Sequence, residues 1–227
     1  MANKSKLLPV ADARERIIAG VRPLGTETVD LNLAAGRVLA RDVKARRDQP
    51  PFAASAMDGY AVRSGDVANC PATLTIAGQS AAGGRYRKKL KPGEAVRIFT
   101  GAPVPQGADC IVIQENTTAR GDQVTVSVPS TPGRYIRPAG LDFKRGAAVL
   151  TAGTRLKVRH IAVAASANAA RIAVRRRPVV ALLGTGNELV LPGQTPGPDQ
   201  IVSSNNASLR AAAESFGGEA LDLGIVK

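Results

Sequence analysis

Residues 45–138 constrain the fold most, because their apolar side chains recur at every second position. That period is typical of β-strands, whose successive side chains point to opposite faces. The alternating apolar residues are Leu74 and Ile76, Val96 and Ile98, and Val124, Val126 and Val128. Gly- and Pro-containing turn signals separate these runs at residues 82–84, 92–93, 106–107 and 120–122. The pattern predicts a β-rich domain over residues 45–138.

Helical periodicity flanks this region on both sides. Residues 9–21 place Val10, Ile17, Ile18 and Val21 on one helical face, with Pro9 suited to a first turn. A second helix is expected from Arg155, with Val158, Ile161, Ala162, Ala165 and Ala169 along one side. Short extended stretches are expected over residues 29–33 and 38–40. We therefore expect a helical and extended segment over 1–44 that pairs with residues 139–176, while the β-rich domain is inserted between them.

The chain changes character again after residue 177. The unbroken apolar run 179–183 is typical of a strand buried on both faces of a parallel sheet. Asn205 or Asn206 is expected to cap a helix that ends at Gly217-Gly218, before a second strand over 220–226. This β-α-β unit predicts the beginning of an α/β domain of the nucleotide-binding type over 177–227. Two strands make an incomplete sheet, so we expect either a truncated form of a longer chain or completion by another chain.

Composition excludes several classes of protein. Hydrophobic residues make up 44% of the 227 residues, an ordinary globular share that excludes disordered, collagen-like and coiled-coil chains. No apolar run approaches the ~18 residues of a membrane span, and no secretory signal core is present, so a cytoplasmic location is expected. Two cysteines are too few for a disulfide framework or a zinc knuckle. His160, the single histidine, lies on the second expected helix, and we assign it no chemistry.

The net charge of +13 has three interpretations. Basic clusters at 85–89 and 175–177 suit nucleic-acid binding, but aromatic residues are only 3% of the chain, with no Trp to stack on bases. The other two interpretations are a solvated basic surface and a site for anionic substrates. Charge alone does not choose among them, although the aromatic content disfavours nucleic acid.

Three loops are rich in residues that carry chemistry. Asp58 lies within 51–61, Thr100 opens the loop 100–109, and Glu188 closes 185–188 after the apolar strand; Asp142 is a weaker fourth candidate. Each loop also has an ordinary explanation as a turn. The Thr100 hydroxyl and the glycine amide beside it suggest an oxyanion cradle. Carboxylates and hydroxyls with abundant Arg and Lys favour Mg²⁺-assisted chemistry on an anionic substrate.

These loops belong to longer motifs that occur in a fixed order. They are Ser55-Ala56-Met57-Asp58-Gly59-Tyr60-Ala61, Ile98-Phe99-Thr100-Gly101-Ala102-Pro103, Arg176-Arg177-Pro178-Val179-Val180, Thr185-Gly186-Asn187-Glu188-Leu189, Ile201-Val202-Ser203-Ser204-Asn205 and Leu223-Gly224-Ile225-Val226. Together they resemble the MoeA family of molybdopterin molybdenumtransferases, which is also seen in the E domain of gephyrin. The resemblance covers nearly the whole chain.

The resemblance implies a multidomain α+β and α/β protein whose last segment, 177–227, begins a three-layer molybdopterin-binding domain. It implies Mg²⁺-dependent insertion of molybdate into adenylylated molybdopterin with release of AMP. It also implies an elongated homodimer with its cleft between protomers, and a contact with the molybdopterin adenylyltransferase. Family members continue past residue 226 with the rest of this domain and a β-barrel, so we expect this chain alone to lack molybdenum insertion activity and an extended version to have it.

The motifs also carry over a set of functional residues. The resemblance assigns catalysis to Asp58, Thr100, Asp142 and Glu188, with Asp58 and Glu188 also holding the metal ion. It assigns substrate binding to Ser55, Gly101, Thr185 and Gly186. Ser203 stands where some relatives have an acidic residue. The alternatives are a non-catalytic chain that dimerises with a full-length relative and, less favoured, a basic nucleic-acid-binding protein.

Overall fold

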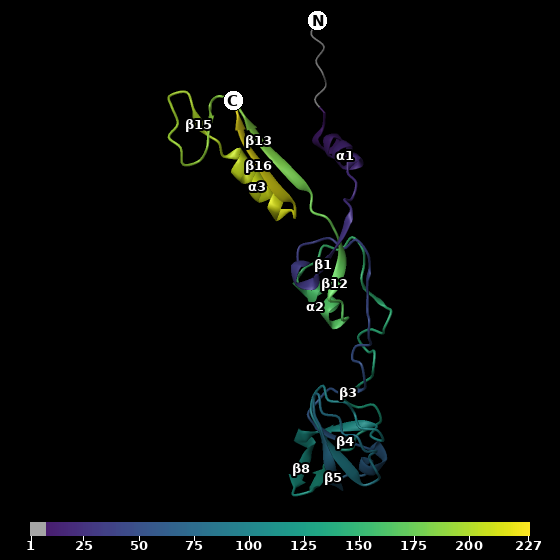
Figure 1. Cartoon of the computed structure of the whole chain (residues 1–227). Helices are drawn as coiled ribbons and strands as arrows, with labels where there is room; N and C mark the ends of the chain where they lie inside the picture. Colours follow the sequence, from purple (N-terminus) through teal and green to yellow (C-terminus); the bar gives the residue numbers. More distant parts are fainter. Residues whose placement is uncertain (1–7) are drawn as a thin grey trace. The chain divides into compact units, whose positions relative to one another are not determined.

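A computed structural model describes residues 8–227 (Figure 1); the first seven residues of the expected 1–44 segment lie outside the described part. The chain divides into two compact units. The sheet unit consists of residues 43–150 and 162–169, and the flanking unit consists of the described part of 1–42 together with 151–161 and 170–227. Each unit is considered by itself below.

A six-stranded sheet dominates the sheet unit, and it confirms the period-two signal. Its strands are β4 (Gly59–Val62), β5 (Ala72–Ser80), β6 (Glu94–Ile98), β7 (Cys110–Ile113), β8 (Thr117–Arg120) and β9 (Gln123–Val126), in the order β7-β4-β6-β5-β9-β8. All neighbours are antiparallel except β5 and β6. The alternating pairs at 74–76, 96–98 and 124–126 lie in β5, β6 and β9, whereas Val128 lies beyond the end of β9.

The sheet is curled, and both faces of its central strands are buried. One core holds Tyr60, Val62, Val67, Leu74, Ala95, Cys110, Val112, Val124 and Val126. The other holds Ala61, Leu90, Val96, Ile98, Ala102 and Ile111. Successive residues of β4 and β7 alternate between the two cores, because the side chains of a strand point to opposite faces. The free thiol of Cys110 lies within the first core, and burial raises its pKa to about 11.

Short elements complete the sheet unit. β2 (Val43–Lys44) pairs with β11 (Ala148–Leu150), and β3 (Ala54–Ser55) pairs with β10 (Ile136–Arg137). Two 3₁₀ turns, η2 (Ser64–Val67) and η3 (Gln114–Asn116), lie between strands of the sheet.

The flanking unit contains the helices expected near the chain start and before its end. They are α1 (Val10–Gly20) and α3 (Asn205–Ser215). The extended stretch expected over 29–33 is confirmed only in part. β1 (Thr26–Asp30) pairs antiparallel with β12 (Arg171–Arg175), but residues 31–33 form the 3₁₀ turn η1 (Leu31–Leu33) because Ala34 N–H bonds back to Leu31.

The second expected helix is present as α2 (Val158–Ser166), whose residues divide between the two units. The apolar side predicted for it is confirmed only in part, since Ile161 is half-buried and Ala169 is buried but lies beyond the end of the helix. Val158 is 85% exposed and Ala162 and Ala165 are exposed, while Ala164 is the buried residue. Alanine carries too little apolar surface to determine which side of a helix packs. The ring of His160 accepts a hydrogen bond from the Lys157 amide, so it serves the start of this helix.

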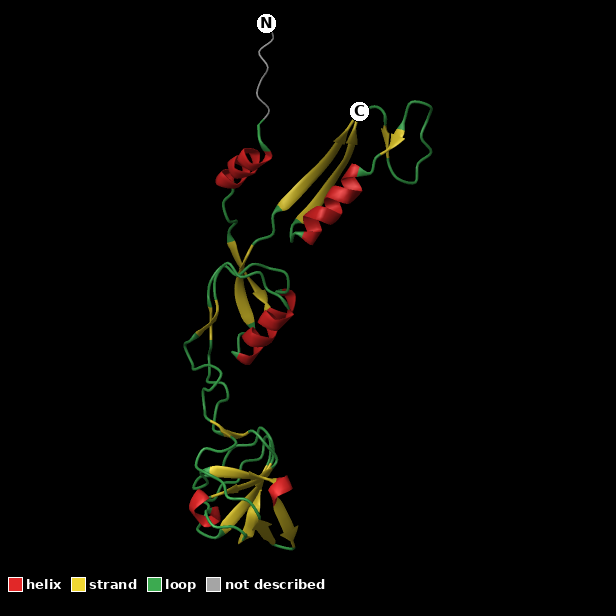
Figure 2. Cartoon of the chain, turned by 180° about the vertical axis from the view of Figure 1, so that it is seen from behind, coloured by secondary structure: helices red, strands yellow, loops and turns green. Residues whose placement is uncertain are grey.

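The predicted β-α-β unit is present after residue 177. β13 (Val179–Thr185) and β16 (Glu219–Val226) pair in parallel, and α3 packs along them (Figure 2). β14 (Leu189–Val190) and β15 (Ile201–Val202) form a second, short parallel pair. Burial of β13 on both faces is wrong for this chain, since Val179 is 63% and Leu183 is 51% exposed. One helix covers one face of a two-stranded pair, so the described residues form two layers here.

The start of α3 also differs from expectation. Ser204 precedes the helix without a side-chain cap, and Asn205 is its first residue. Asn206 is buried and instead donates to Asp222 Oδ1 (3.1 Å) and to the Gly224 carbonyl (3.2 Å). Hydrogen bonds from the Gly224 amide and from the Asn206 side chain lower the pKa of Asp222. Gly217 follows the helix at φ +90, as a C-terminal glycine does.

The longest helices among residues 8–227 have 11 residues each, too few to cross a membrane.

We expect Gly59→Ala to destabilise the sheet unit by about 3 kcal/mol, because strand crowding leaves no room for a methyl group. A Cβ there would overlap the Val112 carbonyl oxygen and come 2.9 Å from Ile113 Cα on β7. Urea unfolding measures the change. Gly65→Ala is the matched control, since nothing lies within 4 Å of a Cβ at that position. Equal stability of the two variants would contradict this account of the packing.

Candidate active site

Asp58 and Thr100 meet at one end of the six-stranded sheet. Asp58 immediately precedes β4, and Thr100 follows β6 after one residue. These two strands pair antiparallel with Gly59 opposite Ile98, so the start of one lies beside the end of the other. The Thr100 amide and the Thr100 hydroxyl both donate to Asp58 Oδ1, each at 2.7 Å. Strand register therefore brings together two residues that are 42 positions apart.

A guanidinium group lies beside this pair. Arg97 stacks near the rings of Tyr60 and Phe99, with its central carbon 5.2 and 5.0 Å from the ring centroids. It donates to the Gly59 carbonyl (3.2 Å) and to Gln114 Oε1 (2.8 Å). The Gln114 amide donates in turn to the Asp58 carbonyl (3.1 Å). Two aromatic faces and two hydrogen bonds thus hold a positive charge close to the Asp58 carboxylate.

These contacts lower the pKa of Asp58 below 3.8. The hydrogen bond from the Thr100 hydroxyl is the largest cause, the Thr100 amide is second, and the charge of Arg97 adds a smaller effect in the same direction. Desolvation opposes them. The carboxylate is therefore ionised throughout the physiological pH range. Oδ1 accepts both Thr100 bonds, and Oδ2 has no hydrogen-bond donor among residues 8–227.

Ser55 and Gly101 lie in the same two loops. The Gly101 amide donates to the Ser55 carbonyl (2.8 Å), and the Ser55 amide donates to the Ala102 carbonyl (2.9 Å). The Ser55 hydroxyl is buried and donates to the Met57 carbonyl (2.6 Å). The expectation of a free oxyanion cradle here is wrong. The Thr100 amide already binds the Asp58 carboxylate, and the Gly101 amide is bonded to Ser55, so neither is free for an external anion.

Asp142 is in the same unit and is joined to Arg137. Both of its carboxylate oxygens accept from Arg137 Nη2 at 2.8 Å. Arg137 belongs to β10, where it pairs with Ala54 of β3, the residue before Ser55. The Asp142 amide donates to the Gln49 carbonyl (2.8 Å). An exposed ion pair thus connects Asp142 to the strand that leads into the Asp58 loop.

The flanking unit holds the other three predicted residues, at the carboxyl end of β13. Thr185 ends the strand, and Gly186 follows with φ +148. A Cβ on Gly186 would come 2.5 Å from Glu188 Oε2, so the Glu188 carboxylate lies directly against this glycine. The Gly186 amide donates to the Val226 carbonyl (3.1 Å), and the Ile201 amide donates to the Glu188 carbonyl (2.7 Å). The backbone angle favours glycine at this position.

The predicted residues thus form one group in each unit. Ser55, Asp58, Thr100 and Gly101 meet in the sheet unit, which also holds Asp142; Thr185, Gly186 and Glu188 meet in the flanking unit. Within residues 8–227, no three or more His, Cys, Asp or Glu side chains cluster in a way that would hold a metal ion. Each group contributes a carboxylate of the kind that Mg²⁺ prefers, and this ion commonly takes one or two carboxylates from the protein.

Sequence analysis missed two residues of this arrangement, Arg97 and Gln114. Arg97 lies between the buried residues Val96 and Ile98 of β6. A charged residue at such a position in an apolar strand is a signal that could have identified it. Gln114 carries no comparable signal, because only the pairing of β4 with β7 brings it to Asp58.

We expect Thr100→Val to raise the pKa of Asp58 toward 3.8, because it removes the hydroxyl hydrogen bond that stabilises the ionised form. NMR titration of the Asp58 carboxyl carbon measures the shift. Thr118→Val changes an exposed threonine of β8 in the same sheet and is expected to leave that pKa unchanged. An unchanged pKa in Thr100→Val would show that the hydroxyl does not stabilise the carboxylate.

Comparison with known proteins agrees with the motifs. Residues 8–168 match the model of the MoeA N-terminal region (domain I and II). The chain is 41% identical over 206 residues to a molybdopterin molybdenumtransferase of Nostoc sp., covering 89% of this chain and 47% of that protein. It is 36% identical over 223 residues to the enzyme of that name in Haemophilus influenzae, covering 97% of this chain and 55% of that protein.

A solved structure is similar over almost all of the chain. The molybdopterin biosynthesis moeA protein of Pyrococcus horikoshii OT3 superimposes with a TM-score of 0.90 at 32% identity, covering 97% of this chain and 60% of that one. The chain spans about half the length of the curated relatives it matches. Sequence and fold agree across both units, and the chain therefore belongs to the MoeA family.

Proposed function

We propose that the protein acts in molybdenum cofactor biosynthesis as a molybdopterin molybdenumtransferase. Its substrates would be adenylylated molybdopterin and molybdate, and AMP would be released in a Mg²⁺-dependent step. Relatives that carry this name support the reaction class. The observation that carries the proposal is the ionised Asp58 carboxylate, which two bonds from Thr100 hold at a loop of the family's motif.

The chemistry of the residues fits a magnesium ion. Asp58 and Glu188 would hold it, since both offer carboxylate oxygens and Asp58 Oδ2 has no donor among the described residues. When bound, Mg²⁺ would supply the positive charge that stabilises the phosphate oxygens during cleavage of the adenylate. Cleavage of a phosphoanhydride depends on such charge stabilisation more than on a covalent nucleophile.

The remaining residues would position these groups. Thr100 keeps Asp58 ionised and aimed in one direction, while the backbone hydrogen bonds of Ser55 with Gly101 and Ala102 fix the two loops that carry the pair. The ion pair of Asp142 with Arg137 would fix the approach to that loop. Thr185 and Gly186 would contact the pterin substrate at the carboxyl end of β13, where open α/β sheets bind ligands.

We also propose a homodimer, with the site completed across the two protomers, and a contact with the adenylyltransferase that makes the substrate. The exposed apolar side of α1 supports a protein contact, since Val10, Ile17 and Ile18 are mostly solvent-exposed. In the proposed organisation, residues 1–44 and 139–176 form one domain, 45–138 form the inserted β-rich domain, and 177–227 belong to the molybdopterin-binding domain.

A chimaera tests the proposal, because this chain matches about half of the Nostoc transferase. Residues 1–227 would replace the matching half of that enzyme, and AMP release from adenylylated molybdopterin with molybdate would be measured. We expect activity within about tenfold of the Nostoc parent, because a correctly placed half supplies the same groups. A folded dimeric chimaera without AMP release would overturn the proposal.

In that chimaera, Asp58→Asn is expected to lower AMP release at least about 100-fold, because it removes the negative charge proposed to hold the metal. Asp122→Asn is the matched control, since Asp122 is exposed in the turn between β8 and β9 of the same unit. Equal rates for the two variants would remove Asp58 from the site.

Metal removal provides a further test. Treatment with EDTA is expected to abolish AMP release, and added Mg²⁺ is expected to restore it, because the carboxylates alone repel the phosphates. Full activity in EDTA would contradict the magnesium requirement while leaving the family assignment unaffected.

A further inference from the structure

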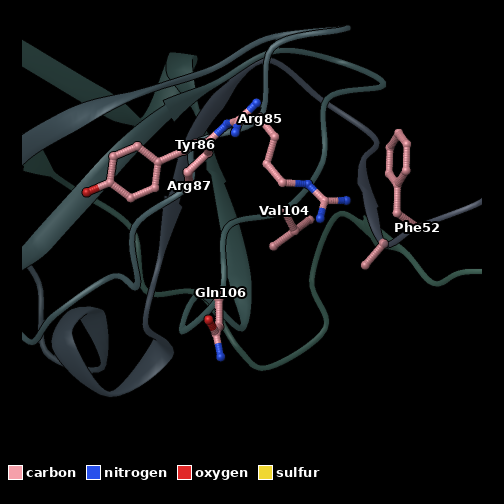
Figure 3. A pocket seen from close by; sticks show the side chains of 7 residues that line it. Phe52, Arg85, Tyr86, Arg87, Val104 and Gln106 are labelled. Atoms are coloured by element: carbon pink, nitrogen blue, oxygen red, sulfur yellow. The ribbon is translucent and has the colours of Figure 1, made fainter.

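A pocket of about 660 Å³ lies in the sheet unit (Figure 3), and neither Asp58 nor Thr100 lines it. It is lined by Phe52, Ala53, Arg85, Tyr86, Arg87, Val104 and Gln106. These residues come from the loop before β3, the segment after β5 and the loop after β6. The volume lies within the range of sites for small organic ligands.

Hydrogen bonds and packing fix the walls of this pocket. The Val104 amide donates to the Ala53 carbonyl (2.9 Å), and the Leu90 amide donates to the Gln106 carbonyl (2.8 Å). The Tyr86 ring packs against Gly78 of β5, where a Cβ would come 2.9 Å from the ring. Tyr86 and Val104 also pack on the buried core. The pocket is therefore preformed, so a ligand would bind without ordering a loop.

Two guanidinium groups give the pocket an uncompensated positive charge. Arg85 and Arg87 are exposed, and neither belongs to any of the ion pairs found among residues 8–227. Lys88 and Lys89 follow them directly and add to the positive field. A guanidinium presents its donors in a planar fork that matches the oxygens of a phosphate.

Aromatic side chains provide the second feature. Arg85 extends toward Phe52, with its guanidinium 5.7 Å from the ring centroid, while the Tyr86 ring points the other way (Figure 3). Phe52 is partly exposed, which leaves apolar ring surface in a charged surrounding. A phosphate alone would use the arginines and leave the Phe52 ring partly in water, whereas a planar ring would cover it.

We propose that this pocket binds a small phosphate ester that carries a planar heterocyclic ring. Arg85 and Arg87 hold the phosphate, and Phe52 contacts the ring. The inference does not depend on the proposed transferase activity, because it uses none of the residues assigned to that reaction. It also gives the 85–89 basic cluster a role other than nucleic-acid binding.

Flavin mononucleotide is a suitable probe, because its fluorescence reports ring stacking and it is not a reactant in the proposed reaction. Titration of the 227-residue protein is expected to show saturable binding at one site. Riboflavin, which lacks the phosphate, is expected to bind at least about tenfold more weakly. Failure to bind flavin mononucleotide, or equal affinity for riboflavin, would overturn the proposal.

Variants assign the binding to this pocket. Arg85→Gln is expected to weaken flavin mononucleotide binding about tenfold, and Arg85→Lys less, because lysine keeps the charge without the fork. Arg120→Gln, an exposed arginine of β8, and Asp58→Asn are expected to have no effect. Circular dichroism establishes that each variant is folded, and Arg87→Gln replaces Arg85→Gln if that variant unfolds.

Three further outcomes would each overturn the proposal: wild-type affinity in Arg85→Gln, a loss in Arg120→Gln equal to that in Arg85→Gln, or displacement of the probe by single-stranded DNA with an affinity that rises with strand length. The last would assign the cluster to nucleic acid. Loss of transferase activity in Asp58→Asn with unchanged flavin mononucleotide binding would separate the two sites.

Discussion

The antiparallel pairing of β4 between β6 and β7 is the interaction on which the described site depends. β4 is buried on both faces, and Gly59 leaves no space for a side chain beside β7. Pairing with a strand on each side fixes the register of β4. The register places Asp58, just before β4, next to Thr100, two residues after the end of β6. A slip of one residue would exchange the two cores and separate Asp58 from Thr100.

In this part of the protein, charged side chains are stabilised by neutral and aromatic groups more than by ion pairs. The Asp58 carboxylate is stabilised chiefly by hydrogen bonds from the hydroxyl and amide of Thr100. The charge of Arg97, which lies near two aromatic rings, has a smaller effect on it. Consequently no donor among residues 8–227 contacts Asp58 Oδ2, which a direct bidentate arginine would have occupied. Asp142 shows the opposite arrangement, since Arg137 takes both of its oxygens.

Much of the architecture was predictable where a local pattern is strong. Alternating leucine, isoleucine and valine residues identified β5, β6 and β9, and the glycine pair at 217–218 marked the end of α3. Prediction failed where packing decides. The prediction of which side of α2 is buried was mostly wrong, because alanines lie on more than one side of that helix. Asn206 bonds to Asp222 instead of capping α3. β13 has the apolar sequence of a buried strand but is mostly exposed. Apolar residues indicate a preference for burial, but burial also requires a neighbouring element that covers the strand.

The amino-acid sequence by itself determined the family, the strands with clear alternation, and the identity of the residues in the motifs, because these depend on residue type and spacing along the chain. Only the tertiary structure decided which of their polar groups are free. It shows that the Thr100 and Gly101 amides are already bonded, that Arg97 lies beside Asp58, and that Phe52 and Arg85 line one pocket. The physical reason is that hydrogen bonding and charge act through space, between residues that strand pairing brings together from distant parts of the chain.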